Sequence, residues 1–161
     1  MDTNRVSART SHLDVSTKYE TSYCIPIWLR NEQIKLSSAR PGVGRIKSYE
    51  GVRHDPIAVA CFGPSLQDTW EQIKPFKYIV SCSGAHKFLL ERGIIPTWHV
   101  EVDPRAHKVD LLGPPHPDVI YLPASACHPN YFDHLEAAHA TVQLWHVFSN
   151  EEDAIRTLPP S

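Results

Sequence analysis

The stretch that most constrains the fold runs from residue 57 to residue 66, where an apolar run gives way abruptly to a tight turn. Ile57 to Phe62 is a short continuous apolar run between Pro56 and Gly63, which is typical of a strand buried on both faces of a parallel sheet. A helix is expected directly after it, because Ser65 is a favourable N-cap residue. Three apolar residues recur in that helix at helical spacing: Leu66, Trp70 and Ile73.

The turn between this strand and this helix is a candidate anion site. Backbone N–H groups at a helix N-terminus and the positive end of the helix dipole favour an anion, and phosphate is the usual occupant. The chain has no GxGxxG and no GxxxxGK[ST] motif at this point. Two interpretations stay open: Gly63, Pro64 and Ser65 bind a nucleotide phosphate, or they form a strand-to-helix connection without a ligand.

From residue 57 onward the chain alternates apolar runs of β type with helical patterns, which predicts right-handed βαβ units and a parallel sheet. The expected fold is α/β, a Rossmann-like doubly wound and mainly parallel sheet of about five strands, in one domain over residues 57–161. Helices are expected after Ser65, over residues 83–93 and over residues 130–140. The expected strands are Ile57 to Phe62, Tyr78 to Cys82, Trp98 to Val102, Val119 to Leu122 and Val142 to Val147.

Polar residues follow each of the first four predicted strands, and ligands of doubly wound sheets bind outside the carboxyl ends of the strands. The candidates for ligand binding are therefore Gly63, Pro64, Ser65, Ser83, Gly84, Arg105 and Ser125. Asp103 is a candidate for holding Mg²⁺ or for bonding a ribose hydroxyl, against the alternative of a helix cap before Pro104. Arg105 offers a planar fork for phosphate, and its alternative is an exposed arginine.

His128 is a candidate general acid or base near neutral pH, and its alternative is a structural role beside Pro129. If the strand at residues 57–62 is central in the sheet, the connections after the first and fourth strands diverge and open a crevice between them. Ser65 and His128 are then expected to face each other. In that arrangement the nucleotide phosphates lie against Gly63 to Ser65, and Ser125 to His128 lines the opposite wall.

Net charge, the lengths of the apolar runs and the cysteine spacing limit which partners are expected. Sixteen basic and eighteen acidic residues give a net charge of −2, which disfavours nucleic acid as a main partner. No apolar run approaches the ~20 residues that span a bilayer, so a cytoplasmic protein with no membrane partner is expected. The four cysteines lack CxxC spacing and are expected to be free thiols, with Cys61 and Cys82 buried in strands.

The residues before the sheet are expected to form two segments. Residues 1–24 are rich in Ser and Thr and show no sustained periodicity, so a poorly ordered arm is expected there. Residues 25–56 form an N-terminal extension in which a short helix is expected around Trp28 to Leu36, followed by a Pro/Gly loop over residues 40–45.

Three segments resemble a known family. Ala60 to Leu66, Leu89 to Pro96 and Val102 to Pro104, in this order and at this spacing, are similar to the 6-hydroxymethylpterin diphosphokinase MptE-like family. The segment Ser125 to Pro129, with Phe132 and Asp133, resembles a branch that is common in bacteriophage genomes. More distantly, the turn is similar to that of sialyltransferase-like and motility-associated glycosyltransferase proteins.

The resemblance implies a nucleotide-binding domain whose relatives use ATP and Mg²⁺ to transfer diphosphate to a hydroxymethyl acceptor, with Asp103 as catalytic and metal residue. Alternatives are a transferase that uses a nucleotide sugar, and a nucleotide-binding module without turnover. The chain departs from the family pattern at Ser83 and Gly84, where asparagine is expected in many relatives. It also lacks the further glycine-rich turn and strand that family members usually have after this point, so either a fragment or a shortened family member is expected.

Overall fold

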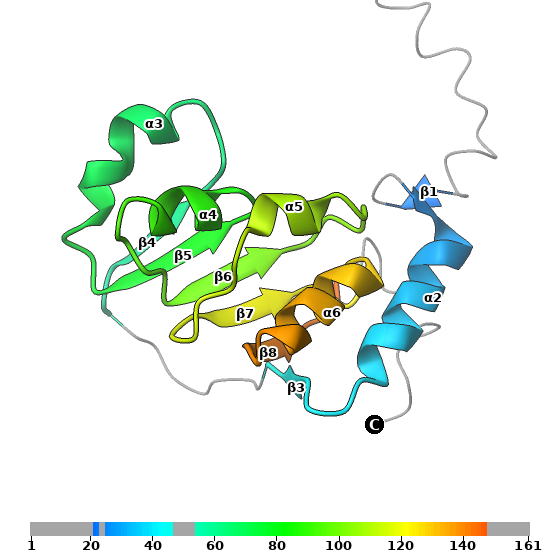
Figure 1. Ribbon diagram of the computed structural model, residues 1–161. Coiled ribbons are helices and arrows are strands. Elements are labelled where there is room, and N and C mark those ends of the chain that lie inside the picture. The colour runs from blue at the N-terminus through cyan, green and yellow to red at the C-terminus, as the bar shows by residue number, and fades with distance from the viewer. Residues whose placement is uncertain (1–20, 23–24, 47–53, 148–161) are drawn as a thin grey trace, which may run out of the picture.

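The computed structural model describes residues 21–22, 25–46 and 54–147, and these residues form a parallel sheet with helices packed against it (Figure 1). The predicted arm over residues 1–24 lies outside the described residues apart from residues 21–22. The strands are β1 (Thr21–Ser22), β2 (Ile25–Pro26), β3 (Gly44–Arg45), β4 (Ile57–Ala60), β5 (Tyr78–Cys82), β6 (Trp98–Glu101), β7 (Ile120–Pro123) and β8 (Thr141–Leu144). The helices are α2 (Ile27–Ser38), α3 (Leu66–Thr69), the 3₁₀ helix η3 (Trp70–Ile73), α4 (Ala85–Leu90), α5 (Lys108–Leu112) and α6 (Pro129–Ala137).

The Rossmann-like α/β class predicted from the sequence is confirmed. All five predicted strands form, and they make four consecutive parallel pairs from β4 to β8. A sixth strand, β3, lies in the predicted Pro/Gly loop and pairs in parallel with β8. The predicted helices after residue 65, near residue 28, near residue 85 and near residue 130 also form, whereas α5 was not predicted.

The strand order differs from the expected one. The sheet runs β3-β8-β7-β6-β5-β4, so β4 lies at an edge and not at the centre. The prediction that this strand is buried on both faces is wrong, because Ile57 and Val59 keep 47% and 62% of their surface exposed. Cys61, expected to be buried, is exposed for the same reason. The apolar run is continuous, but only Ala58 and Ala60 point toward the helices.

The helices that connect β4 to β8 lie on one face of the sheet, since consecutive right-handed crossovers in one direction place them there. In agreement, α4 packs against α5, and α5 packs against α6. Side chains that alternate along the strands point into this layer and form two apolar clusters. One cluster is centred on Tyr121, Tyr131 and Phe132, and the other on Ile79 and Leu89. None of the described helices combines the length and apolarity that a bilayer crossing requires.

Two buried histidines connect the two apolar clusters. His86 Nδ1 lies 2.9 Å from the carbonyl oxygen of Leu112, which only accepts, so Nδ1 carries the proton. His86 Nε2 therefore accepts from the Tyr121 hydroxyl at 2.9 Å. The rings of His86 and His99 contact each other with centroids 4.9 Å apart. Both side chains are buried, at 0% and 1% exposure, and burial disfavours the charged form of each ring.

The second histidine completes this network. His99 Nδ1 lies 3.0 Å from Ser81 Oγ, and Nε2 lies 2.8 Å from the Tyr131 hydroxyl. Burial lowers the pKa of His99 to about 3 and also lowers the pKa of His86. Because each ring nitrogen has a partner, the neutral rings satisfy the buried polar groups around them.

We expect the protein to lose stability as the pH falls below that of an ordinary histidine. In the unfolded chain His99 binds a proton near pH 6.5, whereas in the folded protein it stays neutral down to about pH 3. The unfolded state then binds more protons, so the stability is present above pH 6.5 and is lost as the pH falls toward 3. His99 alone lowers the free energy of unfolding by about 2 kcal/mol between pH 7 and pH 5. Urea denaturation at constant ionic strength measures this loss.

His99→Phe should flatten the pH dependence, and His107→Asn, which changes an exposed histidine, should leave it unchanged. A wild-type free energy of unfolding that is constant from pH 7 to pH 5 would contradict the assignment of a neutral buried His99.

Candidate functional site

Three of the predicted site residues come together at the carboxyl ends of β5 and β6. The two strands are parallel neighbours, so the residues that follow them leave the sheet at the same edge. At the neighbouring ends of β6 and β7 this edge is covered by α2 (Figure 1). Gln33 Nε2 on α2 donates to Pro104 O at 3.3 Å, and Ser37 Oγ donates to Ser125 O at 2.7 Å.

Asp103, Arg105 and Ser83 are brought together by Lys108, a residue that sequence reasoning missed. The ammonium of Lys108 donates to Ser83 Oγ at 3.0 Å and lies 3.4 Å from Asp103 Oδ2. Arg105 Nε donates to Asp103 Oδ1 at 2.9 Å, and the Arg105 Nη2 group bonds Oδ2. We call these four residues, with Glu101 beneath them, the strand-end cluster.

The backbone of this cluster is held in place from two sides. Glu101 is only 4% exposed, and its Oε1 accepts the backbone N–H groups of Val102 and Asp103 at 2.9 and 3.0 Å. Ser83 has a φ of +52°, an uncommon conformation for a residue with a side chain, which lets it leave β5 sharply. One sequence signal could have pointed to Glu101. It is a carboxylate at an inward position of a predicted strand, two residues before an Asp-Pro pair.

Electrostatics keep Asp103 ionised. The side-chain bond from Arg105 is the main cause that lowers the pKa of Asp103 to about 2, and Lys108 acts in the same direction. A carboxylate with so low a pKa is a weak proton acceptor at neutral pH. Asp103 therefore suits the orientation of cationic side chains or of a hydroxyl group better than general-base catalysis.

The turn at residues 63–65 borders this cluster but does not present a preformed anion cradle. The Gly63 amide donates to Cys61 O at 3.0 Å, and the amides of Leu66, Gln67 and Asp68 are engaged within the turn and α3. Moreover, α3 has only four residues, so it contributes a short dipole. A Cβ built at Gly63 meets nothing within 4 Å, so no close contact inside the protein requires a glycine there.

Gly84, in contrast, is required by packing. A Cβ at this position would lie 2.7 Å from the ring of Phe62. Phe62, which precedes the turn, therefore packs directly against the start of α4. This contact brings the turn close to Ser83. Gly84 is a packing residue in this structure, and its role in ligand binding stays a prediction.

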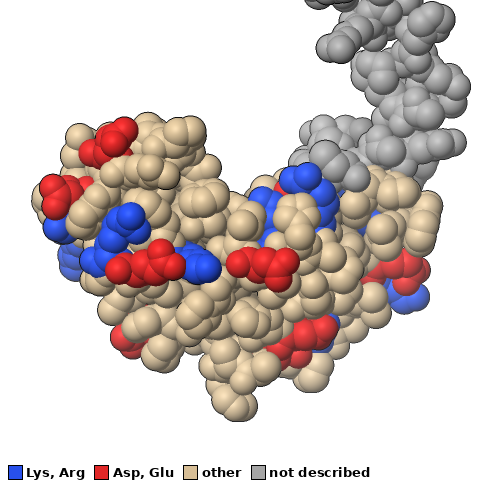
Figure 2. Space-filling view, turned by 45° about the horizontal axis from the view of Figure 1, so that its top comes forward, with Lys and Arg blue, Asp and Glu red and all other residues tan. Residues whose placement is uncertain are grey.

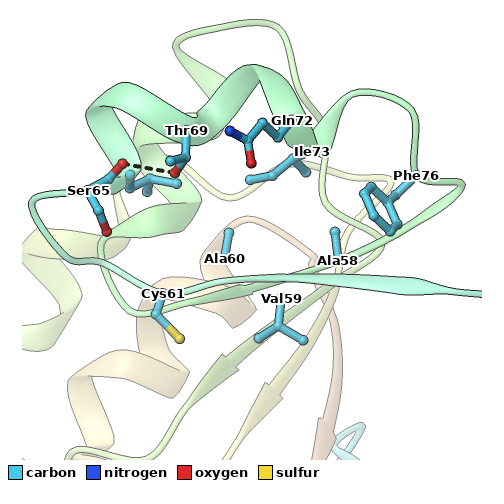
Figure 3. A pocket seen from close by; sticks show the side chains of 10 residues that line it. Ala58, Val59, Ala60, Cys61, Ser65, Thr69, Gln72, Ile73 and Phe76 are labelled. Atoms are coloured by element: carbon cyan, nitrogen blue, oxygen red, sulfur yellow. Dashed lines mark hydrogen bonds between the residues drawn. The ribbon is translucent and has the colours of Figure 1, made fainter.

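A cavity of about 400 Å³ lies between β4 and the α3–η3 segment (Figure 3). Ala58 and Ala60 point into it from the strand, while Thr69, Gln72 and Ile73 face it from above (Figure 3). None of the ten lining residues that the structure describes is charged. The volume falls within the range of small-molecule pockets, but the lining suits an uncharged group and not a phosphate.

Ser125 and His128 do not line a crevice opposite Ser65. Ser65 follows the edge strand β4, and His128 follows β7, which is three strand spacings or about 14 Å away in the sheet. The predicted crevice is therefore wrong, because it depended on a central position for β4. Ser125 is fully buried, and its hydroxyl bonds His146 Nδ1 at 2.7 Å.

His128 caps α6 instead of facing the turn. The backbone N–H of Asn130 donates to His128 Nδ1 at 3.3 Å, and the Asn130 side chain donates to Ala106 O at 3.0 Å. These bonds fix the start of α6 beside the loop that leads into α5. The structure thus supports the structural interpretation of His128, and its proposed action on an acceptor hydroxyl loses its geometric basis.

The strand-end cluster offers basic groups at the surface. Lys108 is 14% exposed, and the side chain of Arg105 is about half exposed. Lys and Arg side chains gather over the start of α5, beside the hollow between the α3 end and the α2 end of the molecule (Figure 2). Convergent cationic donors of this kind suit the oxygens of a phosphate group.

The cluster does not fit a directly bound Mg²⁺ as it stands. Both oxygens of Asp103 accept from Arg105, so a cation would have to displace a guanidinium and approach an ammonium. Within the described residues, no group of three or more His, Cys, Asp or Glu side chains is arranged to hold a metal ion. The predicted metal role of Asp103 thus has no support from the geometry.

We therefore expect that the protein without nucleotide binds no divalent cation at Asp103 in the submillimolar range. Electron paramagnetic resonance of Mn²⁺ measures the free ion during a titration. Wild type, Asp103→Asn and the control Asp110→Asn, which changes an exposed carboxylate on α5, should give the same curve. A site that is present in wild type and in Asp110→Asn but lost in Asp103→Asn would contradict this account.

Comparison with known proteins agrees with the fold and with the predicted resemblance. Residues 32–154 match the family described as 6-hydroxymethylpterin diphosphokinase MptE-like. A solved structure, the MAf glycosyltransferase from Magnetospirillum magneticum AMB-1, is similar to this chain with a TM-score of 0.57 and 20% identity.

That similarity covers 74% of this chain and 20% of the glycosyltransferase, so this chain spans about a fifth of the length of that protein. A search of curated proteins gave no match. At this level of identity the structural similarity concerns the Rossmann-like fold, whereas the family match covers most of the chain. The chain belongs to the 6-hydroxymethylpterin diphosphokinase MptE-like family, a family of transferase type.

Proposed function

We propose that the protein binds a nucleoside triphosphate at the strand-end cluster and transfers its terminal diphosphate to a hydroxymethyl group of a small acceptor. The observation that carries this proposal is the convergence of Lys108, Arg105 and Ser83 at the carboxyl ends of β5 and β6. This edge is where open parallel α/β sheets bind their ligands. The family to which the chain belongs supplies the type of reaction.

The charges and donors of the cluster suit a polyphosphate. Arg105 offers a planar fork of donors, and Lys108 offers a compact positive charge that is already held in place by Ser83. In the free protein the Asp103 carboxylate pairs with both Arg105 and Lys108. A bound phosphate group would accept some of the hydrogen bonds that these two side chains now donate to Asp103 or Ser83. The ionised Asp103 would then orient the cations without accepting a proton.

In the proposed reaction the acceptor hydroxyl oxygen forms a bond to the β-phosphorus of the nucleotide. The bond between this phosphorus and the oxygen that bridges to the α-phosphate breaks, and the nucleoside monophosphate leaves. The hydroxyl proton passes to solvent or to a phosphate oxygen, because Asp103 is too weakly basic. Arg105 and Lys108 stabilise the charge that develops on the phosphate oxygens.

The cavity between β4 and the α3–η3 segment runs along the edge strand and is lined by uncharged residues. Its small floor residues, Ala58 and Ala60, and its polar wall residues, Thr69 and Gln72, suit a flat heterocycle with hydrogen-bonding edges. We assign this cavity to the uncharged part of a ligand, and the strand-end cluster to the phosphates.

Isothermal titration calorimetry tests the proposal with ATP, GTP, CTP, CMP and AMP, each with and without Mg²⁺. We expect a nucleoside triphosphate to bind, and Lys108→Met to weaken this binding about tenfold or more, as the loss of one charge-assisted hydrogen bond implies. The matched control is Lys74→Met, which changes an exposed lysine near the end of η3 and should alter the affinity less than twofold.

Circular dichroism checks that the two variants remain folded. Equal affinities of wild type and Lys108→Met would place the phosphate site elsewhere. Binding of CMP in preference to ATP would favour a nucleotide-sugar-dependent transferase. Tight ATP binding with no formation of AMP when a hydroxymethyl pterin is added would favour a module without turnover. Absence of binding by any of these nucleotides would contradict the proposal.

A further inference from the structure

Two cysteines that the sequence places far apart are partners on neighbouring strands. The last registered pair of β4 and β5 is Ala60 with Ser81, and Cys61 and Cys82 are the residues that directly follow this pair. Neighbouring strands lie about 4.8 Å apart, which is inside the range of about 4.4–6.8 Å over which disulfides join two Cα atoms. The Cα spacing expected at the end of this strand pair therefore falls within the disulfide range.

The two side chains also leave the sheet on the same face. Ala60 and Ser81 are buried against the helices, so the residues that follow them point the other way. Figure 3 shows Cys61 and Val59 projecting away from the α3–η3 segment. After burial, the neighbouring Cys61 thiol is the next cause that raises the pKa of Cys82, so the two side chains lie close together. The register, the shared face and this proximity together bring the two thiols to one place on the surface of the sheet.

We propose that Cys61 and Cys82 are a reversible modification site, a dithiol that closes to a disulfide in the presence of a small-molecule disulfide such as glutathione disulfide. The proposal does not depend on nucleotide binding. It rests on the strand register and on the face of the sheet that the two side chains share. The site differs from Cys127, which is buried on the helix side of the sheet.

The exposure of the two thiols sets the order of the steps. Cys61 is exposed, whereas Cys82 is half-buried, and burial is the main cause that raises the pKa of Cys82 to about 11. The Cys61 thiolate attacks one sulfur of the oxidant, forms a mixed disulfide and releases one small thiol. Cys82 then loses its proton and attacks the Cys61 sulfur, which releases the second small thiol. Two electrons pass from the protein to the oxidant, and the two sulfur atoms of the oxidant leave as two thiols that carry the two protons.

The position of the site gives the disulfide a structural consequence. The cross-link would lie one residue before Phe62 and one residue before Ser83. Phe62 rests on Gly84, and Ser83 accepts a bond from Lys108. The oxidised protein would therefore hold the turn at residues 63–65 and the start of α4 in a fixed relation.

The test exposes the full chain to an excess of glutathione disulfide and identifies the products by peptide mass spectrometry. We expect a peptide in which Cys61 and Cys82 are linked, and in the Cys24→Ser variant a fall from three to one free thiol after denaturation, which dithiothreitol reverses. In Cys82→Ser we expect Cys61 to stop at the mixed disulfide with glutathione. The control Cys24→Ser changes a cysteine outside the described residues and should retain the linked peptide.

Two results would overturn the proposal. One is a wild-type protein in which Cys61 accumulates as the mixed disulfide, because Cys82 then fails to resolve it. The other is the absence of any modification at Cys61 in both wild type and Cys82→Ser. Urea denaturation gives an independent check, since a disulfide that needs no strand movement should raise the denaturation midpoint of the oxidised protein. A lower midpoint would show that the bond distorts the sheet and would also count against the site.

Discussion

Parallel pairing of β4 to β8 in chain order is the constraint on which the rest of this structure depends. It places the connecting helices on one face and gathers the residues that follow each strand at one edge. It also makes β4 an edge strand, which leaves Ile57 and Val59 exposed. The strand-end cluster and the pair of neighbouring cysteines both depend on which strands are neighbours in the sheet.

Two histidines are buried inside this fold, and their ring nitrogens are hydrogen-bonded. His86 and His99 lie between two apolar clusters, and their ring nitrogens are paired with tyrosine, serine and backbone partners. A network of this kind favours one arrangement of the helices on the sheet, because any shift would leave buried groups without partners. At the edge of the same layer Glu101 fixes the backbone from which Asp103 projects. The cluster is thus supported by packing that is independent of any ligand.

Much of the fold was predictable from the sequence because its signals are local. Strand β5 matches its predicted bounds, since an apolar run ends at Ser83 and Gly84. The order of the strands was not predictable, because Ile57 and Val59 are as apolar as residues of a central strand. Lys108 was missed because α5 has only five residues and no sustained periodicity. Of the predicted site, Ser83, Asp103 and Arg105 come together, whereas Ser125 and His128 serve the packing of α2 and α6.

The central claim is that the phosphates of a nucleotide bind at the strand-end cluster and not at the turn after β4. Nuclear magnetic resonance of the isotope-labelled protein tests it most directly, by following backbone amide shifts during a titration with ATP. The account predicts that the largest saturable shifts occur at Ser83 and over residues 105–108. Shifts confined to residues 63–65, or no saturable shift at any amide, would contradict it.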